Sequence, residues 1–237
     1  MKKRILAILL SVTMLAALTV VLSGCGEKGE KVTLYVYNWG EYISDGSEES
    51  LDVNAEFENY CREELGLNVK VNYSTFSSNE DMYAKISSGA AVYDVIIPSD
   101  YMIQRMVAEG LVQPLNLDYI PNYAYISEEF KGENVYYEPQ DGNVYSVPYT
   151  YGMIGMIYNT AIVPEDCESI GSWGLMWDEQ FRGDILQFNN SRDAFGTALY
   201  YLGYDVNEAT EEQWREALTL LKEQKALVQC YVMYEIV

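Results

Sequence analysis

Residues 33–42 of the chain read TLYVYNWGEY, and this stretch decides the fold. Its first part, through Asn38, combines β-branched and aromatic side chains, which is typical of a buried strand. Trp39, Glu41 and Tyr42 follow at the point where that strand ends. The stretch therefore predicts a strand that delivers two aromatic rings and a carboxylate to the loop after it.

Strand and helix patterns alternate after this stretch. Two more strand-like runs lie at residues 68–73 and 94–98, and the helical patterns between and after them end at Gly66, Gly89 and Gly110. Strand–helix–strand at this spacing predicts parallel strands joined by right-handed crossovers, and therefore an α/β sheet. In such sheets the ligand crevice lies outside the carboxyl ends of the strands.

Serines precede two of the expected helices. Ser77 and Glu80 have the spacing of a capping box, which predicts that a helix begins after Ser77. Ser99 is placed to cap the next helix, and Tyr101 lies in the first turn of that helix. Because Ser99 and Tyr101 follow the end of the third strand, they are predicted to face the same crevice as Trp39.

The second half of the chain predicts another lobe. Residues 116–143 are loop-like, and residues 145–159 read as a long strand with two glycines inside it, which suits a hinge crossing. We expect a first α/β lobe over residues 32–150 and a partial second α/β lobe over residues 151–237. The elements expected in the second lobe are a short helix at 172–183, a strand at 184–188, a helix led by Ser191, and a helix that starts with a capping box at Thr210 and Gln213.

The composition favours a binding protein over an enzyme. The chain has 36 acidic and 15 basic residues, a net charge of -21, which repels nucleic acid and favours cationic partners, although acidity also serves solubility alone. It contains no histidine, which removes Ser-His and Cys-His catalysis and His-based metal sites. Cys61, Cys167 and Cys230 match no metal motif, and Cys61 has the helical spacing of a small buried thiol. We therefore expect no enzymatic activity, no cofactor and no metal.

The N-terminus reads as a targeting segment. A basic MKKR sequence precedes an apolar run over residues 5–22, and LSGCG closes it at residues 22–26. This ending resembles a bacterial lipobox, which implies a signal peptide at residues 1–24, lipidation of Cys25 and a tether over residues 25–31. An uncleaved anchor helix is the alternative, and both interpretations place the rest of the chain outside the cytoplasmic membrane.

Two clusters carry candidate binding chemistry, and each has a structural alternative. Aromatic faces attract ammonium groups by about 0.5–2 kcal/mol per contact, and Glu41 adds a carboxylate beside Trp39 and Tyr42. Simple packing also explains rings in a chain with 22 tyrosines. Asp193 lies in the first turn of an expected helix, where it either binds an amine or only complements the helix dipole.

Five segments together resemble one family. They occur in the same order and at similar spacing in periplasmic spermidine/putrescine-binding proteins, the substrate-binding subunits of polyamine ABC importers. The segments are LYVYNWGEY, NEDMYAKISSGAAVYD, IIPSDYMIQRMVAEGLVQPL, YSVPYTYG and NNSRDAF. The resemblance implies the two-lobe type II periplasmic binding protein fold, with a polyamine held by residues of both lobes.

The resemblance also implies site residues in the first lobe. Trp39 and Tyr42 match aromatic contacts, and Glu41 matches the acidic residue between them. Ser99 and Tyr101 match polar contacts of the same lobe.

In the second lobe, the resemblance assigns an acidic amine partner to Asp193. Asn190 stands where some members have Asp, which leaves the preference between diamine and triamine open, and Tyr151 stands where some have Trp. The implied partners are the permease subunits of the importer and the membrane, which the protein contacts only through its lipid anchor. Nucleic acid is not an expected partner.

The chain departs from this family in length. Members continue well beyond residue 237, finish the second lobe and cross back to the first. We therefore expect an incomplete second lobe, a partial polyamine site, and weak or absent binding by this chain. Four alternatives stay open. The first is a binding protein of the same fold whose ligand is another organic cation, a sugar or iron, and the second is an extracellular hydrolase that uses Glu41 and Asp193. The others are a lipoprotein that only contacts proteins and a non-functional fragment.

Overall fold

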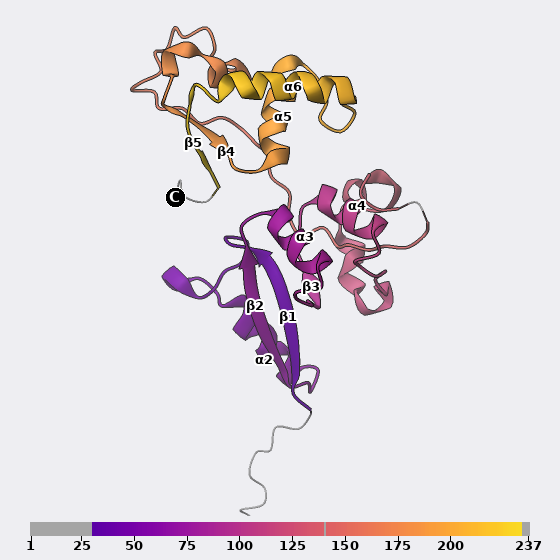
Figure 1. Ribbon diagram of the computed structural model, residues 1–237. Coiled ribbons are helices and arrows are strands. Elements are labelled where there is room, and N and C mark those ends of the chain that lie inside the picture. Colours follow the sequence, from indigo (N-terminus) through magenta and orange to yellow (C-terminus); the bar gives the residue numbers. More distant parts are fainter. Residues whose placement is uncertain (1–29, 140, 234–237) are drawn as a thin grey trace, which may run out of the picture. The chain divides into compact units, whose positions relative to one another are not determined.

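The computed structural model describes residues 30–139 and 141–233 and has an α/β architecture with two separate parallel sheets (Figure 1). The chain divides into two compact units. Unit 1 holds the described residues up to Asn116 together with Val135–Ser146, and unit 2 holds Leu117–Asn134 and the residues from Val147 onward. Each unit is described below by itself.

Unit 1 is built on a three-stranded parallel sheet of order β2-β1-β3, as the alternating pattern predicts. β1 pairs with β2 over its whole length, from Val32↔Val69 to Trp39↔Phe76, so the two carboxyl ends coincide. The strands are β1 Val32–Trp39, β2 Val69–Phe76 and β3 Val95–Ile96. The third strand is therefore much shorter than the expected run over residues 94–98.

Three helices follow the strands of unit 1, with a short 3-10 helix, η1 Ser47–Glu49, before the first of them. The helices are α2 Val53–Glu63, α3 Asn79–Ser87 and α4 Asp100–Ala108. The glycines predicted to end them, Gly66, Gly89 and Gly110, have φ angles of 65°, 70° and 67°, a left-handed conformation that glycine adopts without strain. Cys61 is buried, as predicted.

The start of α3 differs from the prediction by one residue. The N-cap is Ser78, whose hydroxyl accepts the Asp81 N–H at 3.1 Å. Ser77 instead donates its hydroxyl to the Asp81 carboxylate at 3.0 Å. Two consecutive serines offer two registers for the cap, and the sequence pattern selected the wrong one.

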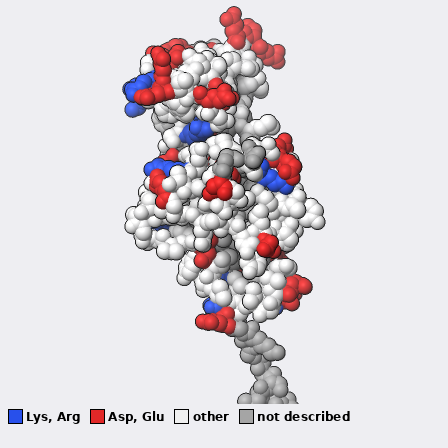
Figure 2. Space-filling model, turned by 90° about the vertical axis from the view of Figure 1, so that its right-hand side faces the viewer, with Lys and Arg blue, Asp and Glu red and all other residues white. Residues whose placement is uncertain are grey.

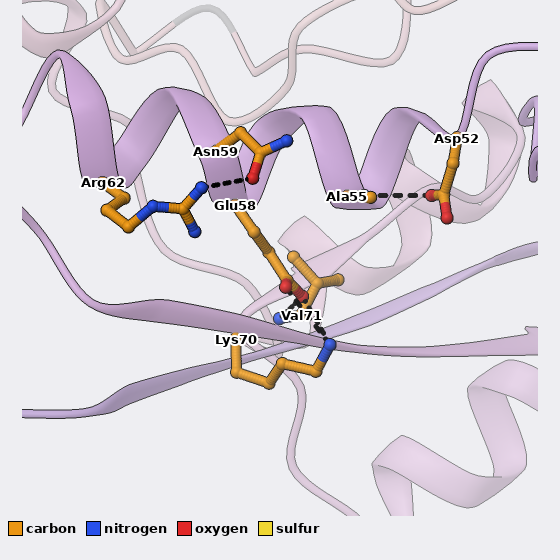
Figure 3. A network of polar contacts seen from close by, with 7 residues as sticks. All are labelled: Asp52, Ala55, Glu58, Asn59, Arg62, Lys70 and Val71. Carbon is orange, nitrogen blue, oxygen red and sulfur yellow. Dashed lines mark hydrogen bonds and ion pairs between the residues drawn. The ribbon is translucent and has the colours of Figure 1, made fainter. Parts of the chain in front are cut away.

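Glu58 ties α2 to the edge of the sheet (Figure 3). Its carboxylate accepts the Val71 N–H at 2.9 Å and lies 3.0 Å from the Lys70 ammonium. Burial opposes ionisation of this carboxyl, but the Val71 N–H and Lys70 together hold its pKa below the usual range. The folded state therefore favours the ionised form of Glu58.

Replacing Glu58 with glutamine is expected to lower stability by about 1 kcal/mol at pH 7, and this loss is expected to shrink as the pH falls through the folded-state pKa of Glu58. A lowered folded-state pKa stabilises the protein above the unfolded pKa of about 4.3, and this contribution disappears as the pH falls through the folded value. Urea unfolding between pH 7 and pH 3 measures the difference. Glu63→Gln, an exposed site on the same helix, is the control, and an equal pH dependence in both variants would contradict the assignment.

The segment expected as a long hinge strand over residues 145–159 is not a strand. At its start, the backbone N–H groups of Tyr145 and Ser146 donate to the buried Glu138 carboxylate at 2.9 and 2.8 Å. These donors are therefore not available to a neighbouring strand, which corrects the prediction at this end. Residues 116–139 and 141–143 are irregular as expected, with four short 3-10 helices, η2 Leu117–Tyr119, η3 Pro121–Tyr125, η4 Glu128–Phe130 and η5 Gly132–Asn134.

Unit 2 contains a second parallel sheet made of β4 and β5. The elements after residue 170 are η6 Trp173–Trp177, η7 Glu179–Phe181, β4 Ile185–Phe188, α5 Ser191–Leu202, α6 Glu211–Gln224 and β5 Val228–Val232. The capping box of Thr210 and Gln213 is confirmed. The prediction of one helix over residues 172–183 is wrong, because two short 3-10 helices, η6 and η7, stand there instead. The strand β5 was not predicted.

Buried amides link the elements of unit 2. Gln187 on β4 donates to Thr197 on α5 and to the Gln224 side chain on α6, both at 3.1 Å. Gln224 in turn donates to the Met176 carbonyl at 3.1 Å. Gln187, Thr197 and Gln224 are at most 2% exposed, so these bonds lie inside the unit that carries α5.

Within residues 30–139 and 141–233, no helix has the length and apolarity required to cross a membrane. The predicted signal peptide and the lipidation site at Cys25 lie outside the described residues.

Candidate functional site

The carboxyl ends of β1 and β2 place Trp39 beside aromatic neighbours. Trp39 is paired with Phe76 across the sheet, and their ring centroids are 4.6 Å apart. Tyr42 lies next to it, with a centroid distance of 6.2 Å. The Trp39 ring is only 6% exposed, whereas Tyr42 is 40% exposed and Glu41 lies at the surface. Trp39 thus has a packing role in unit 1 whatever it binds, while Tyr42 and Glu41 reach solvent.

Ser99 and Tyr101 follow β3 at the same edge of the sheet and are joined by a buried amide. Asn79 donates to the Ser99 hydroxyl at 3.0 Å and to the Tyr101 hydroxyl at 2.9 Å. The Ser99 side chain forms no cap bond to α4, although Ser99 occupies the N-cap position. The expected capping role of its side chain is therefore wrong, because the hydroxyl contacts Asn79 instead.

The structure brings these two hydroxyls together on one amide, and the residue that joins them was missed. Asn79 lies at the first position of α3, after the end of β2, where sequence reasoning saw only a helix start. The single clue in the sequence is a polar residue that directly follows the expected cap. Its partners are 20 and 22 residues away, so no local pattern reveals them.

In unit 2, the N-terminus of α5 holds Asn190 and Asp193. Asn190 is the N-cap, and its side-chain oxygen accepts the N–H groups of Arg192 and Asp193 at 2.9 and 3.3 Å. Asn190 is 7% exposed, so its oxygen serves the helix. The helix begins at Ser191 as predicted, and Asn190 caps it from the position before.

Asp193 lies in the first turn of α5 and is half-buried. The neighbouring Arg192 points its guanidinium at the Asn207 side-chain oxygen, 2.8 Å away, and lies over the Trp214 ring at 5.9 Å. The helix dipole stabilises a carboxylate at this position but opposes a cation at the same helix end. A contact between Asp193 and a cation is therefore favoured by partial burial, which weakens the screening by water, and by the charge of the carboxylate itself.

Tyr151 differs from the other candidates in its surroundings. It is 74% exposed and stacks on Phe130 with a centroid distance of 4.8 Å. A ring held by one partner and open on its remaining surface is suited to a second stacking contact.

On the face of the molecule that Figure 2 shows, charge by itself does not mark a binding surface. On the face shown in Figure 2, acidic and basic side chains are scattered rather than gathered into one patch. Among the described residues, no group of three or more Cys, Asp or Glu side chains is arranged to hold a metal ion. The three cysteines at positions 61, 167 and 230 are free thiols.

The family model described as bacterial extracellular solute-binding protein matches residues 55–234. The chain belongs to this family. Its members bind solutes and are not enzymes. The predicted α/β solute-binding architecture is therefore confirmed, and the hydrolase alternative is not favoured.

Curated relatives of the chain carry polyamine names. It is 32% identical over 191 residues to the "Spermidine/putrescine-binding periplasmic protein" of Escherichia coli, which covers 80% of this chain and 50% of the relative. It is 28% identical to the "Putrescine/cadaverine-binding protein" of Pseudomonas aeruginosa, over 85% of this chain and 53% of the relative. The chain thus spans about half the length of the curated relatives it matches.

Solved structures agree with this family. A putative spermidine/putrescine ABC transporter protein from Listeria monocytogenes matches with a TM-score of 0.71 and 32% identity, over 86% of this chain and 58% of that one. The Tp0655 (TpPotD) lipoprotein of Treponema pallidum matches with a TM-score of 0.70 and 29% identity, over 86% and 59%. These similarities confirm the type II periplasmic binding protein fold.

Proposed function

We propose that this solute-binding protein captures putrescine or spermidine outside the cytoplasm for import by an ABC transporter. The observation that carries the proposal is the group of rings, hydroxyls and a carboxylate at the carboxyl edge of the unit 1 sheet, in a chain whose relatives are named for these polyamines. Tyr42, Glu41, Ser99 and Tyr101 are the proposed contacts from unit 1, with Trp39 as a supporting ring.

Asp193 is the proposed acidic contact from unit 2, and Tyr151 a proposed stacking contact. Asn190 contributes by holding the first turn of α5, since its oxygen already accepts two backbone N–H groups. Residues 32–150 and 151–237 remain our proposed lobes, and Cys25 remains our proposed lipid attachment point to the outer face of the membrane.

The chemistry of a polyamine suits these residues. An alkyl amine has a pKa of roughly 10, like a lysine side chain, and is therefore cationic at neutral pH. Its methylene groups favour aromatic faces, and its ends favour carboxylates and hydroxyl oxygens. Capture requires no covalent step, so the lack of histidine in the sequence is compatible with the proposed activity.

The chain from Gly26 onward is expected to bind putrescine and spermidine weakly, with a dissociation constant on the order of millimolar. NMR titration detects such binding through shifts of the Trp39 indole, Tyr101 ring and Asp193 signals. The matched control ligand is 1,4-butanediol, which has the same length as putrescine and no charge. Signals that stay in place with both polyamines, or that move equally with butanediol, would contradict polyamine capture.

A further inference from the structure

Asn79 is the most enclosed polar residue at the candidate site. Its side chain is 0% exposed and makes three hydrogen bonds to α4 and the residue before it. The amide nitrogen donates to the hydroxyls of Ser99 and Tyr101, and the amide oxygen accepts the Ser99 N–H at 3.1 Å.

This geometry determines the polarity of the two hydroxyls. Both hydrogens of the Asn79 amide point at hydroxyl oxygens, so Ser99 and Tyr101 act as acceptors toward Asn79. Tyr101 donates its own proton to the Glu80 carboxylate at 3.3 Å. The Tyr101 proton is therefore directed toward α3, and its oxygen is an acceptor for any further partner.

We propose that Asn79 is a positioning residue that holds the Ser99 and Tyr101 hydroxyls as a pair of acceptors for a primary ammonium group. This inference rests on the proposed polyamine function. The Tyr101 oxygen, whose proton goes to Glu80, accepts from an ammonium group but has no proton to offer a carboxylate or a carbonyl, and the Ser99 oxygen lies beside it as a second acceptor. The Tyr101 oxygen thereby favours a hydrogen-bond donor over an anionic acceptor, and the Glu80 carboxylate that it contacts favours a cationic donor over a neutral one of the same size.

The competing interpretation is that Asn79 only fastens α3 to the start of α4. A purely structural role predicts the same loss from Asn79→Leu whether or not the two hydroxyls are present. A positioning role predicts that the loss depends on them.

The first experiment needs no ligand. In protein labelled with ¹³C on its tyrosine rings, the Tyr101 signal is identified as the one missing from Tyr101→Phe. Asn79→Leu is expected to move this signal, because the ring loses the amide that contacts its hydroxyl. A Tyr101 signal that is unchanged in Asn79→Leu would overturn the proposal.

The second experiment is a double-mutant cycle with putrescine as the probe. Asn79→Leu is expected to weaken binding about 5- to 10-fold in the natural chain and less than about 2-fold in Ser99→Ala/Tyr101→Phe. Met82→Ala, another fully buried site on α3, is the control for destabilisation alone and should leave the dissociation constant within about 2-fold.

The outcomes separate the two proposals. Equal losses in both backgrounds would show that Asn79 is only structural. A natural chain that binds no putrescine would overturn the proposed function, while the Tyr101 ring signal would still decide whether Asn79 positions the hydroxyl.

Discussion

Replacing Asp193 with asparagine is expected to weaken putrescine binding by about 10- to 100-fold. Asp193 is half-buried in the first turn of α5. An ammonium group would form a charge-assisted hydrogen bond with its carboxylate at this position, from which water is partly excluded. The substitution keeps the shape of the side chain and removes only the charge. NMR titration of both proteins, followed through the Tyr101 and Trp39 signals, measures the loss.

The control for this prediction lies in the same unit. Glu212 also stands in the first turn of a helix, α6, and is exposed, so Glu212→Gln removes the same charge from a comparable position. It is expected to change binding by less than about 2-fold, because exposed charges are screened by salt. If both variants weaken binding equally, the effect comes from net charge and Asp193 is not a ligand contact.

The strands and helices of unit 1 could be predicted because their signals are local. The alternation that begins at residue 33 switches period at each strand end, and glycines end the helices in left-handed conformations that glycine permits. Parallel pairing follows from that alternation with few alternatives. This reasoning also placed Trp39, Ser99 and Tyr101 at one edge of the sheet.

Predictions failed where distant residues decide the structure. The short run after Gln224 was not recognised as a strand, and it forms β5 by pairing with the distant β4. Residues 145–146 looked extended, but their N–H groups donate to Glu138, seven and eight residues earlier. Ser99 had the pattern of a cap, and only Asn79 reveals the other use of its hydroxyl.

At the candidate site residues of unit 2, the sequence likewise predicted one feature and missed another. Asp193 was identified as a first-turn carboxylate, which the sequence pattern alone supports. The start of the helix at Ser191 was predicted, but the capping role of Asn190 was missed because Asn190 was considered only as a ligand contact. Residue identity therefore limits the candidates, and only tertiary contacts decide between them.

Replacing Gln224 with leucine is expected to lower the stability of unit 2 by about 3 kcal/mol. The side chain is 0% exposed, accepts from Gln187 and donates to the Met176 carbonyl. Leucine leaves a Gln187 hydrogen and this carbonyl buried without their partner, and each such group costs about 1–3 kcal/mol. Urea unfolding followed by tryptophan fluorescence reports on unit 2, because it contains three of the four tryptophans, Trp173, Trp177 and Trp214.

Two further variants test whether the buried network causes this loss. Gln229→Leu makes the same chemical change at an exposed position of β5 and is expected to alter stability by less than about 0.5 kcal/mol. Gln187→Leu combined with Gln224→Leu is expected to cost less than the sum of the single changes, because neither amide then leaves the other unpaired. Strictly additive losses would mean that the two amides act independently. The Gln187–Gln224 bond would then not be what joins β4 to α6 in the unit that carries Asp193.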